Sequence, residues 1–289
     1  MAYRGADGLA VCQRHRRLLD ARADGKTVRP TKYLACAAVV LLASCAAFAE
    51  TDLSGMPALK TASRHPVQYY LSLPKGWSSQ KQWPVLLAID ASYGDFYANV
   101  ERFSRARKDS PFIVVVPFLT DGRSVPANER NTKFHYSPEV WRRIDKEGPL
   151  SFDLAALDAI LAEIRTQYGG EEKPFLTGWG KDGGSITWTL VFTQPERWRA
   201  VALACPYFQA EDTIKVSERP ERLDLPVMVF QGESDFLRVN AGLDTQWEKA
   251  KQIAEAHGYK NLSRVLVPEK FHDPLAGEVV QFFSSRLKP

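Results

Sequence analysis

The hydrophobic residues of this chain gather in short runs that alternate with segments of helical periodicity. Seven runs are typical of β-strands: Val67–Leu73, Pro84–Ile89, Phe112–Val116, Pro174–Thr177, Ala200–Ala204, Val227–Gln231 and Ser263–Val267. Helical spacing extends from Phe152 to Ile164 and from Trp247 to Ala254, ending before Gly258. Runs such as FIVVV and VMVF are apolar without alternation, which is typical of strands covered on both faces. The pattern therefore predicts an α/β fold with a mostly parallel sheet covered by helices on both faces.

Length and composition favour a single large domain. The chain has 289 residues, of which 45% are hydrophobic, and α/β folds often fill such a length as one domain. We expect this domain over residues 50–289, after a leader over residues 1–49. Thr120–Leu150 is a long stretch rich in charge and proline. We expect it to be irregular and to overhang a site.

The leader has the features of a secretory signal peptide. Leu34–Ala49 is an uncharged apolar run that follows Arg29 and Lys32. Its last three residues, Ala-Phe-Ala, form a small-x-small cleavage site before Glu50. Because the run is shorter than the ~20 residues that a spanning helix needs, a permanent membrane anchor is the less favoured interpretation.

A second cleavage site overlaps the first. Leu42–Cys45 resembles the lipobox of bacterial lipoproteins, in which the cysteine becomes the lipidated first residue. Both sites remain open, so we expect an exported protein, periplasmic or secreted, whose only membrane attachment would be a lipid on Cys45. Cys12 and Cys36 belong to the leader, and Cys205 is the one cysteine beyond it. No intramolecular disulfide or cysteine metal site is therefore expected.

Charge argues against nucleic acid as a partner. The net charge of +4 arises in residues 1–49, which contain 8 of the 38 basic and 3 of the 34 acidic residues. The remaining 30 basic and 31 acidic residues make the predicted domain nearly neutral. Without a basic excess there is no electrostatic attraction toward nucleic acid or anionic membranes. The sequence leaves the oligomeric state open.

Three predicted strand ends carry residues suited to chemistry. In an open parallel sheet, ligands bind at the carboxyl ends of the strands. A glycine-rich turn at residues 178–184 follows the strand that ends at Thr177 and leads into a helix that runs to about Gln194. The segments that follow the last two strands are Gly232–Asp235 and residues 268–274.

This layout resembles the α/β-hydrolase family, and more narrowly its secreted esterases and polyester depolymerase-like members. There the nucleophile, acid and histidine follow one another in this order. The resemblance extends from the Pro84–Ala88 strand to the final His-Asp-Pro-Leu and implies an α/β-hydrolase fold without a cofactor. It also implies that Asp235 orients His272 and that His272 is the general base and acid. Either residue alone is as easily a turn aspartate or a surface histidine, but their order and places favour catalysis.

The nucleophile turn departs from the family pattern. The family would have Thr-Gly-Phe-Ser-x-Gly-Gly, whereas residues 177–184 are Thr-Gly-Trp-Gly-Lys-Asp-Gly-Gly, without serine and with one residue added. Alignment from the strand puts Gly180 at the nucleophile position, and alignment from the glycine pair puts Lys181 there. Only the Gly-x-nucleophile-x-Gly spacing places a capable group at the apex, namely Asp182. An aspartate could attack an alkyl carbon, as in dehalogenases and epoxide hydrolases of this fold, or it could be a helix-start carboxylate.

The remaining predicted site residues surround this turn. In the Asp182 register the N–H of Gly183 would serve the oxyanion hole, together with a backbone donor at Ala91 or Ser92 after the third strand. The neighbouring Asp90 would repel an oxyanion unless turned away or paired. Four aromatic residues beside strand ends could line an apolar pocket, although such residues more often belong to the core: Trp179, Tyr93, Phe208 and Phe236.

We expect no metal, because the other histidines lack partners at metal-ligand spacing. His65, His135 and His257 are therefore interpreted as surface residues.

Three functions compete. The leading one is a hydrolase of an ester-like small molecule or polymer end, with acid and histidine retained and the serine replaced. The second is a catalytically silent binding protein of the same fold. The third is a hydrolase of the dehalogenase or epoxide hydrolase type with Asp182 as nucleophile, although Gly183 then stands where a leaving-group-binding side chain is expected.

Overall fold

A computed structural model describes residues 56–89, 95–120, 125–126, 128, 130–134, 136–209 and 214–287. By its internal contacts the chain divides into Met1–Ala49 and Glu50–Pro289. The predicted leader, with both cleavage sites and Cys45, lies outside the described residues. No helix in the described part of the chain combines the length and apolar character needed to cross a bilayer.

The core of the second unit is a sheet of eight strands in the order β1-β2-β4-β3-β5-β6-β7-β8. Strands β3 to β8 run parallel, whereas β1 and β2 pair antiparallel at one edge. The strands are β1 Ala58–Thr61, β2 Gln68–Ser72, β3 Val85–Ile89, β4 Ile113–Pro117, β5 Phe175–Trp179, β6 Ala200–Ala204, β7 Val227–Gly232 and β8 Leu262–Val267. All seven predicted strands are present. Only β1 was not predicted, because its four residues are half exposed and follow a polar segment.

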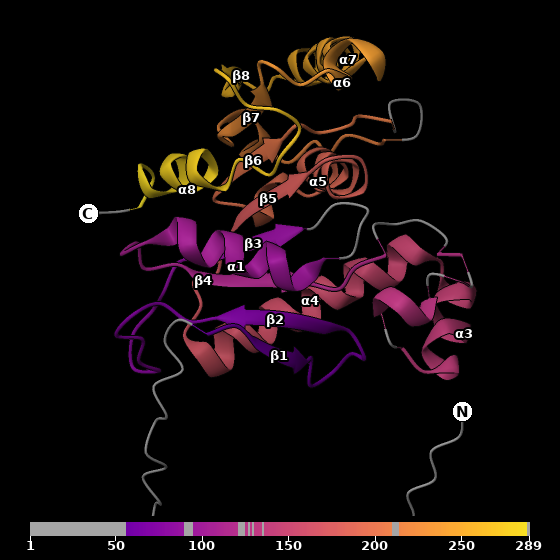
Figure 1. Cartoon of the computed structure of the whole chain (residues 1–289), viewed down its shortest axis with the longest axis vertical. Coiled ribbons are helices and arrows are strands. Elements are labelled where there is room, and N and C mark those ends of the chain that lie inside the picture. Colours follow the sequence, from indigo (N-terminus) through magenta and orange to yellow (C-terminus); the bar gives the residue numbers. More distant parts are fainter. Residues whose placement is uncertain are drawn as a thin grey trace, which may run out of the picture. The chain divides into compact units, whose positions relative to one another are not determined.

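Helices cover both faces of the sheet (Figure 1). Helices α1 and α8 pack on one face, and α4, α5 and α7 pack on the other. The helices are α1 Phe96–Arg107, α3 Pro138–Glu147, α4 Pro149–Tyr168, α5 Asp182–Thr193, α6 Leu237–Asn240, α7 Leu243–Ala256 and α8 Ala276–Ser284, with short turns at Arg130–Phe134, Pro195–Arg197 and Pro220–Leu223. The predicted α/β class is therefore confirmed.

Helix α3 contradicts the prediction that Thr120–Leu150 is irregular. Its start is fixed by Ser137, whose hydroxyl accepts a hydrogen bond from the N–H of Val140, and by proline at the first helical position. Only two of its side chains, Trp141 and Ile144, are buried. Val140, Trp141 and Ile144 have helical spacing, but this apolar stripe is short and lies in a segment rich in charge and proline, so the sequence as a whole indicates an irregular stretch.

His65 also differs from prediction, because it is buried and not on the surface. Its Nδ1 accepts a hydrogen bond from the N–H of Val67 at 3.3 Å, and its ring lies 4.4 Å from that of Phe152. Burial, helped by the positive charge of Arg143, lowers the pKa of His65 to about 4. His257 is partly exposed, with Nδ1 3.5 Å from Glu218. His135 lies outside the described residues.

Candidate active site

The side chains of Asp235 and His272 form a hydrogen-bonded pair beyond the carboxyl ends of β7 and β8. Nδ1 of His272 lies 2.8 Å from Oδ2 of Asp235. The Asp235 side chain is fully buried, whereas that of His272 keeps 19% of its surface exposed. Because an ionised carboxylate only accepts, the pairing favours the tautomer with the proton on Nδ1, and Nε2 can then accept a proton. The pairing expected from the sequence is present.

Backbone hydrogen bonds join the loops that carry the two residues. The N–H of Glu233 donates to the carbonyl of Val267 at 2.9 Å, and that of Ser234 donates to Lys270 at 2.9 Å. Gly232 lies where the two loops approach each other closely. A β-carbon at this position would stand 2.5 Å from the Lys270 carbonyl oxygen. The loops therefore hold the pair together without relying on the Asp235–His272 bond alone.

Two further donors bind the Asp235 carboxylate. Nε2 of Gln231 lies 2.6 Å from Oδ2, the oxygen that also faces His272. The backbone N–H of Leu237 donates to Oδ1 at 2.9 Å. Hydrogen bonds to a carboxylate compensate for its loss of water on burial, so these two donors stabilise the buried Asp235 side chain beneath the histidine.

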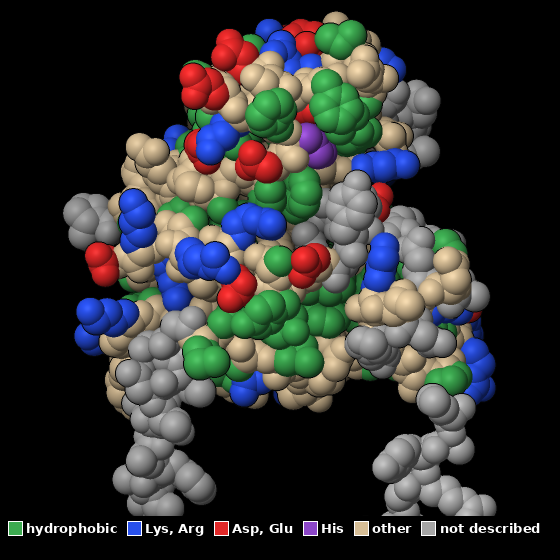
Figure 2. Space-filling view, in the orientation of Figure 1, with side chains coloured by type: hydrophobic (Ala, Val, Ile, Leu, Met, Phe, Trp, Pro, Cys, Tyr) green, Lys and Arg blue, Asp and Glu red, His purple; other side chains and the backbone are tan. Residues whose placement is uncertain are grey.

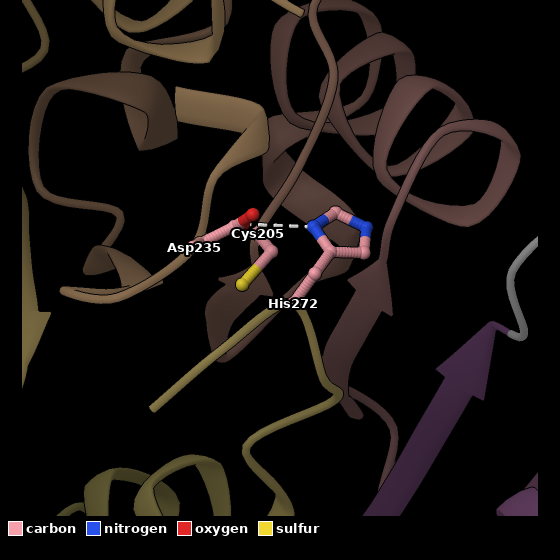
Figure 3. A group of neighbouring side chains, drawn as sticks. All are labelled: Cys205, Asp235 and His272. Atoms are coloured by element: carbon pink, nitrogen blue, oxygen red, sulfur yellow. Dashed lines mark hydrogen bonds and ion pairs between the residues drawn. The ribbon is translucent and has the colours of Figure 1, made fainter. Parts of the chain in front are cut away.

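Cys205 lies on the Asp235 side of the pair (Figure 3). It follows β6 with a φ of 44°, a backbone conformation that is uncommon for residues other than glycine. The thiol donates to the carbonyl of Phe271 at 3.7 Å. Burial raises the pKa of Cys205 to about 12, so the thiol stays protonated at neutral pH and is a poor nucleophile.

Two aromatic rings lie near the imidazole of His272. In Figure 3 the second ring nitrogen points away from Asp235 and Cys205. The ring centroid of His272 lies 5.8 Å from Trp179, the last residue of β5, and 6.2 Å from Tyr207. The imidazole therefore lies near the end of β5, and its second nitrogen points away from the acid.

The turn from β5 into α5 is made at Gly180. Its φ is 65°, and it is the residue between strand and helix with a left-handed backbone. Its N–H donates to Ala204 at 3.1 Å, and its carbonyl accepts from Tyr207 at 3.1 Å. A strained apex between strand and helix is the hallmark of a nucleophile elbow, and here glycine occupies it.

This geometry corrects the register that placed Asp182 at the apex. Asp182 is the first residue of α5, two positions beyond the turn, and Gly183 is buried in the same helical turn. The register counted from the strand, with Gly180 at the nucleophile position, is the one the backbone adopts. The N–H that follows the apex is accordingly that of Lys181 and not that of Gly183, because the extra residue lies within the helix.

The other predicted pocket residues fall in three different places. Ala91, Ser92 and Tyr93 lie outside the described residues. Phe208 is buried and packs against Trp188 in the core. Trp179 lies beside His272, and Phe236 is 62% exposed.

Exposed apolar side chains adjoin the pair. Phe236 follows Asp235 directly, and Phe271 precedes His272, with 62% and 63% of their surfaces exposed. Val239 in α6 is 82% exposed. Figure 2 shows a histidine among hydrophobic side chains on the upper part of this face. We call Phe236, Val239 and Phe271, which are exposed and close to Asp235 or His272 in the sequence, the apolar rim.

Comparison with solved structures identifies the fold. The poly(3-hydroxybutyrate) depolymerase from Bordetella parapertussis is 19% identical with a TM-score of 0.54, over 80% of this chain and 88% of that one. An S-formylglutathione hydrolase from Agrobacterium tumefaciens is 14% identical with a TM-score of 0.55, over 81% and 94%. The Bacillus cereus carboxylesterase is 15% identical with a TM-score of 0.53, over 78% and 97%.

The chain has the α/β-hydrolase fold. No family model and no curated protein matches the sequence. The predicted resemblance is therefore confirmed at the level of the fold, and at these identities the structures say nothing of what this chain acts on.

By distance alone, Cys205, Asp235 and His272 could hold a metal ion, since one ligand atom from each lies within 4.8 Å of the others. Their chemistry argues for a hydrogen-bonded pair instead. Oδ2 of Asp235 already faces two nitrogen atoms, and the Cys205 thiol donates to the carbonyl of Phe271.

Sequence analysis missed three residues of the site: Cys205, Tyr207 and Gln231. Cys205 and Tyr207 follow the carboxyl end of β6. The sequence does not mark this strand end as a site, because a lone cysteine and an aromatic residue are common in protein cores. Gln231 ends a run that otherwise is apolar. A buried strand that closes on a polar side chain is the signal that could have found it.

Proposed function

We propose that this chain is an ester hydrolase in which His272, oriented by Asp235, activates a water molecule as general base. The observation that supports this most directly is the 2.8 Å contact between His272 Nδ1 and Asp235 Oδ2. With a proton held on Nδ1, Nε2 is the basic nitrogen, and it lies on the side of the ring away from the acid. The water loses its proton to Nε2 and its oxygen bonds to the ester carbonyl carbon. When the tetrahedral intermediate collapses, the bond from that carbon to the alcohol oxygen breaks, and Nε2 returns the proton to the departing alkoxide, which leaves the acid and the alcohol as products.

Water is the proposed nucleophile because the protein groups near the histidine are poor candidates. Gly180 stands at the apex of the turn and has no side chain. The Cys205 thiol is protonated at neutral pH and lies on the Asp235 side of the ring. The N–H of Lys181, which follows the apex, is in the position that serves the oxyanion hole in this fold.

The apolar rim favours an ester with an apolar acyl or alcohol part, either a small molecule or the end of a polymer. An aromatic side chain left in water becomes favourable to bury against a ligand of matching character. The known hydrolases of this fold include a carboxylesterase and a poly(3-hydroxybutyrate) depolymerase, which is consistent with an ester but does not select one.

The test is hydrolysis of a panel of p-nitrophenyl esters by the wild type and by His272→Ala. A general base contributes about 10²- to 10⁴-fold, so we expect the variant to fall by at least about 10²-fold while keeping its melting temperature. A wild-type rate equal to that of His272→Ala would end the proposal and favour a catalytically silent binding protein. The absence of a side chain at Gly180, the apex of the turn, supports that alternative.

Asp182→Ala separates the water mechanism from the hypothesis that Asp182 is the nucleophile. With water as nucleophile, this variant should retain most of its turnover and lose about 0.3 to 1 kcal/mol of stability, the usual contribution of a carboxylate in the first turn of a helix. If Asp182 forms a covalent intermediate, turnover disappears, and Asp182→Asn recovers slowly as the amide hydrolyses.

We also propose that the chain is exported, on the strength of its apolar run after Arg29 and Lys32. N-terminal sequencing of the exported protein should find Glu50, or an acylated Cys45 if the lipobox is used. Recovery of an intact Met1 from the cell envelope would contradict export.

A further inference from the structure

Gln231 is a buried polar side chain whose amide contacts the acid of the Asp235–His272 pair. It lies in β7 with 1% of its surface exposed. Its Nε2 stands 2.6 Å from Oδ2 of Asp235. A carboxylate cannot donate, so the amide presents its N–H₂ group there. The bond is charge-assisted and therefore stronger than one between neutral groups.

We propose that Gln231 is a positioning residue that holds Asp235 in the orientation in which it binds His272. The role in turnover rests on the proposed function, whereas the effect on the hydrogen bond does not. Because Gln231 and His272 both approach Oδ2, the amide prevents the carboxylate from rotating about its χ2 bond and turning that oxygen away from the imidazole.

The neighbouring groups cannot replace this bond. The N–H of Leu237 occupies the other oxygen, Oδ1. The thiol of Cys205 donates to the carbonyl of Phe271. Loss of the Gln231 amide would leave Oδ2 with His272 as its one donor among these groups. A rigid strand is also a precise support, because Gln231 is paired in register with Leu266 of β8.

The experiment compares Gln231→Met, which keeps the length of the side chain without a donor, with the wild type by proton NMR of the full chain. The Nδ1–H proton of His272 in its bond to a carboxylate resonates downfield of the amide region. We expect that resonance to move upfield and to exchange faster with water in the variant. We also expect kcat on a p-nitrophenyl ester to fall by about tenfold to hundredfold, the equivalent of one hydrogen bond to a charged group, with little change in KM.

Asn99→Leu is the matched control. Asn99 is also a fully buried amide, but neither its Nδ2 nor its Oδ1 has a hydrogen-bond partner within the described ranges. It lies in α1 and should leave the His272 resonance and kcat as they are. Gln231→Leu serves as a second variant should Gln231→Met fail to fold, since buried strands accept leucine.

The two proposals fail in different ways. A His272 resonance with unchanged position and exchange rate in a folded Gln231 variant would overturn the positioning role, whatever the turnover. If the wild type has no turnover but the His272 resonance still moves in the Gln231 variant, the proposed function is overturned. The positioning of Asp235 by Gln231 is then supported.

Discussion

Gly232 and Phe271 lie so close together that a β-carbon on the glycine would overlap the carbonyl oxygen of the phenylalanine. Gly232 ends β7, three residues before Asp235, and Phe271 directly precedes His272. The contact therefore sets the separation of the two loops that bring acid and histidine together. A glycine is required here by the close approach of another backbone and not by its own dihedral angles.

Gly232→Ala should separate the pair. The added carbon would force the 268–272 segment outward, and overpacking of this kind costs about 1–3 kcal/mol. We expect a lower melting temperature, a loss of at least about tenfold in esterase kcat, and loss of the downfield His272 resonance. Gly277→Ala is the control, because nothing lies within 4 Å of that position in α8 and alanine favours a helix. Equal behaviour of the two variants would show that the loop contact does not position the histidine.

Much of the sheet could be predicted from the sequence because its strands are buried on both faces. Strands β3, β4 and β6 are buried at every residue, and such strands appear as unbroken apolar runs bounded by polar residues. Asp235 and His272 could be placed together for the same reason: they follow adjacent parallel strands, whose carboxyl ends share one edge of the sheet.

The turn at Gly180 could not be decided from the sequence. Three registers fit the residues 178–184, and glycine tolerates both the apex and the helix start. Only the observed backbone, with the positive φ at Gly180 and Asp182 as the first helical residue, selects one. The contact between Gln231 and Asp235 could not be predicted either, because it depends on how the Asp235 side chain in the loop after β7 is oriented toward Gln231. Neither feature leaves a periodic signal.

The apolar rim should set the preference for the acyl chain. Replacing Phe236 and Phe271 by serine removes two exposed rings beside the pair, and burial of a phenylalanine against an apolar ligand contributes about 1.5–3 kcal/mol at most. We expect KM for a long-chain p-nitrophenyl ester to rise about tenfold, with little change for the acetate. Leu59→Ser is the control, since Leu59 is 49% exposed but lies in β1 at the other edge of the sheet. An equal effect on both esters would exclude the rim from substrate binding.

His65 should make the stability of the protein sensitive to acid. Its pKa is lowered to about 4 in the folded state, from 6.5 when unfolded. The unfolded state therefore binds the proton first, so stability is complete above pH 6.5, falls between pH 6.5 and 4, and levels off below. The shift corresponds to a loss of about 3 kcal/mol.

His65→Asn checks this dependence. An asparagine can still accept the N–H two residues ahead, as the histidine does from Val67, but it cannot titrate. Urea unfolding at several pH values should give the variant a flatter dependence between pH 6.5 and 4 than the wild type. His257→Asn, at a partly exposed position, is the control for loss of an imidazole. Parallel curves for His65→Asn and wild type would contradict the assignment.

Gly180→Ser tests whether the Asp235–His272 pair is still aimed at the apex of the turn. The apex already has a positive φ of 65°, which serine can adopt at a cost of about 1–3 kcal/mol. The new hydroxyl would stand at the nucleophile position of the fold, and the general base should activate it. We expect a fluorophosphonate probe to label the variant at residue 180, and p-nitrophenyl acetate to give a burst of product as the acyl-enzyme forms.

Gly180→Ala, which has the same strain without a hydroxyl, should give neither. Adding His272→Ala to Gly180→Ser should slow labelling by about 10² or more, since the hydroxyl then lacks its base. If the folded Gly180→Ser variant is labelled no faster than the Gly180→Ser/His272→Ala double variant, the imidazole does not face the turn. Direct activation of a water molecule above Gly180 would then lose its geometric basis.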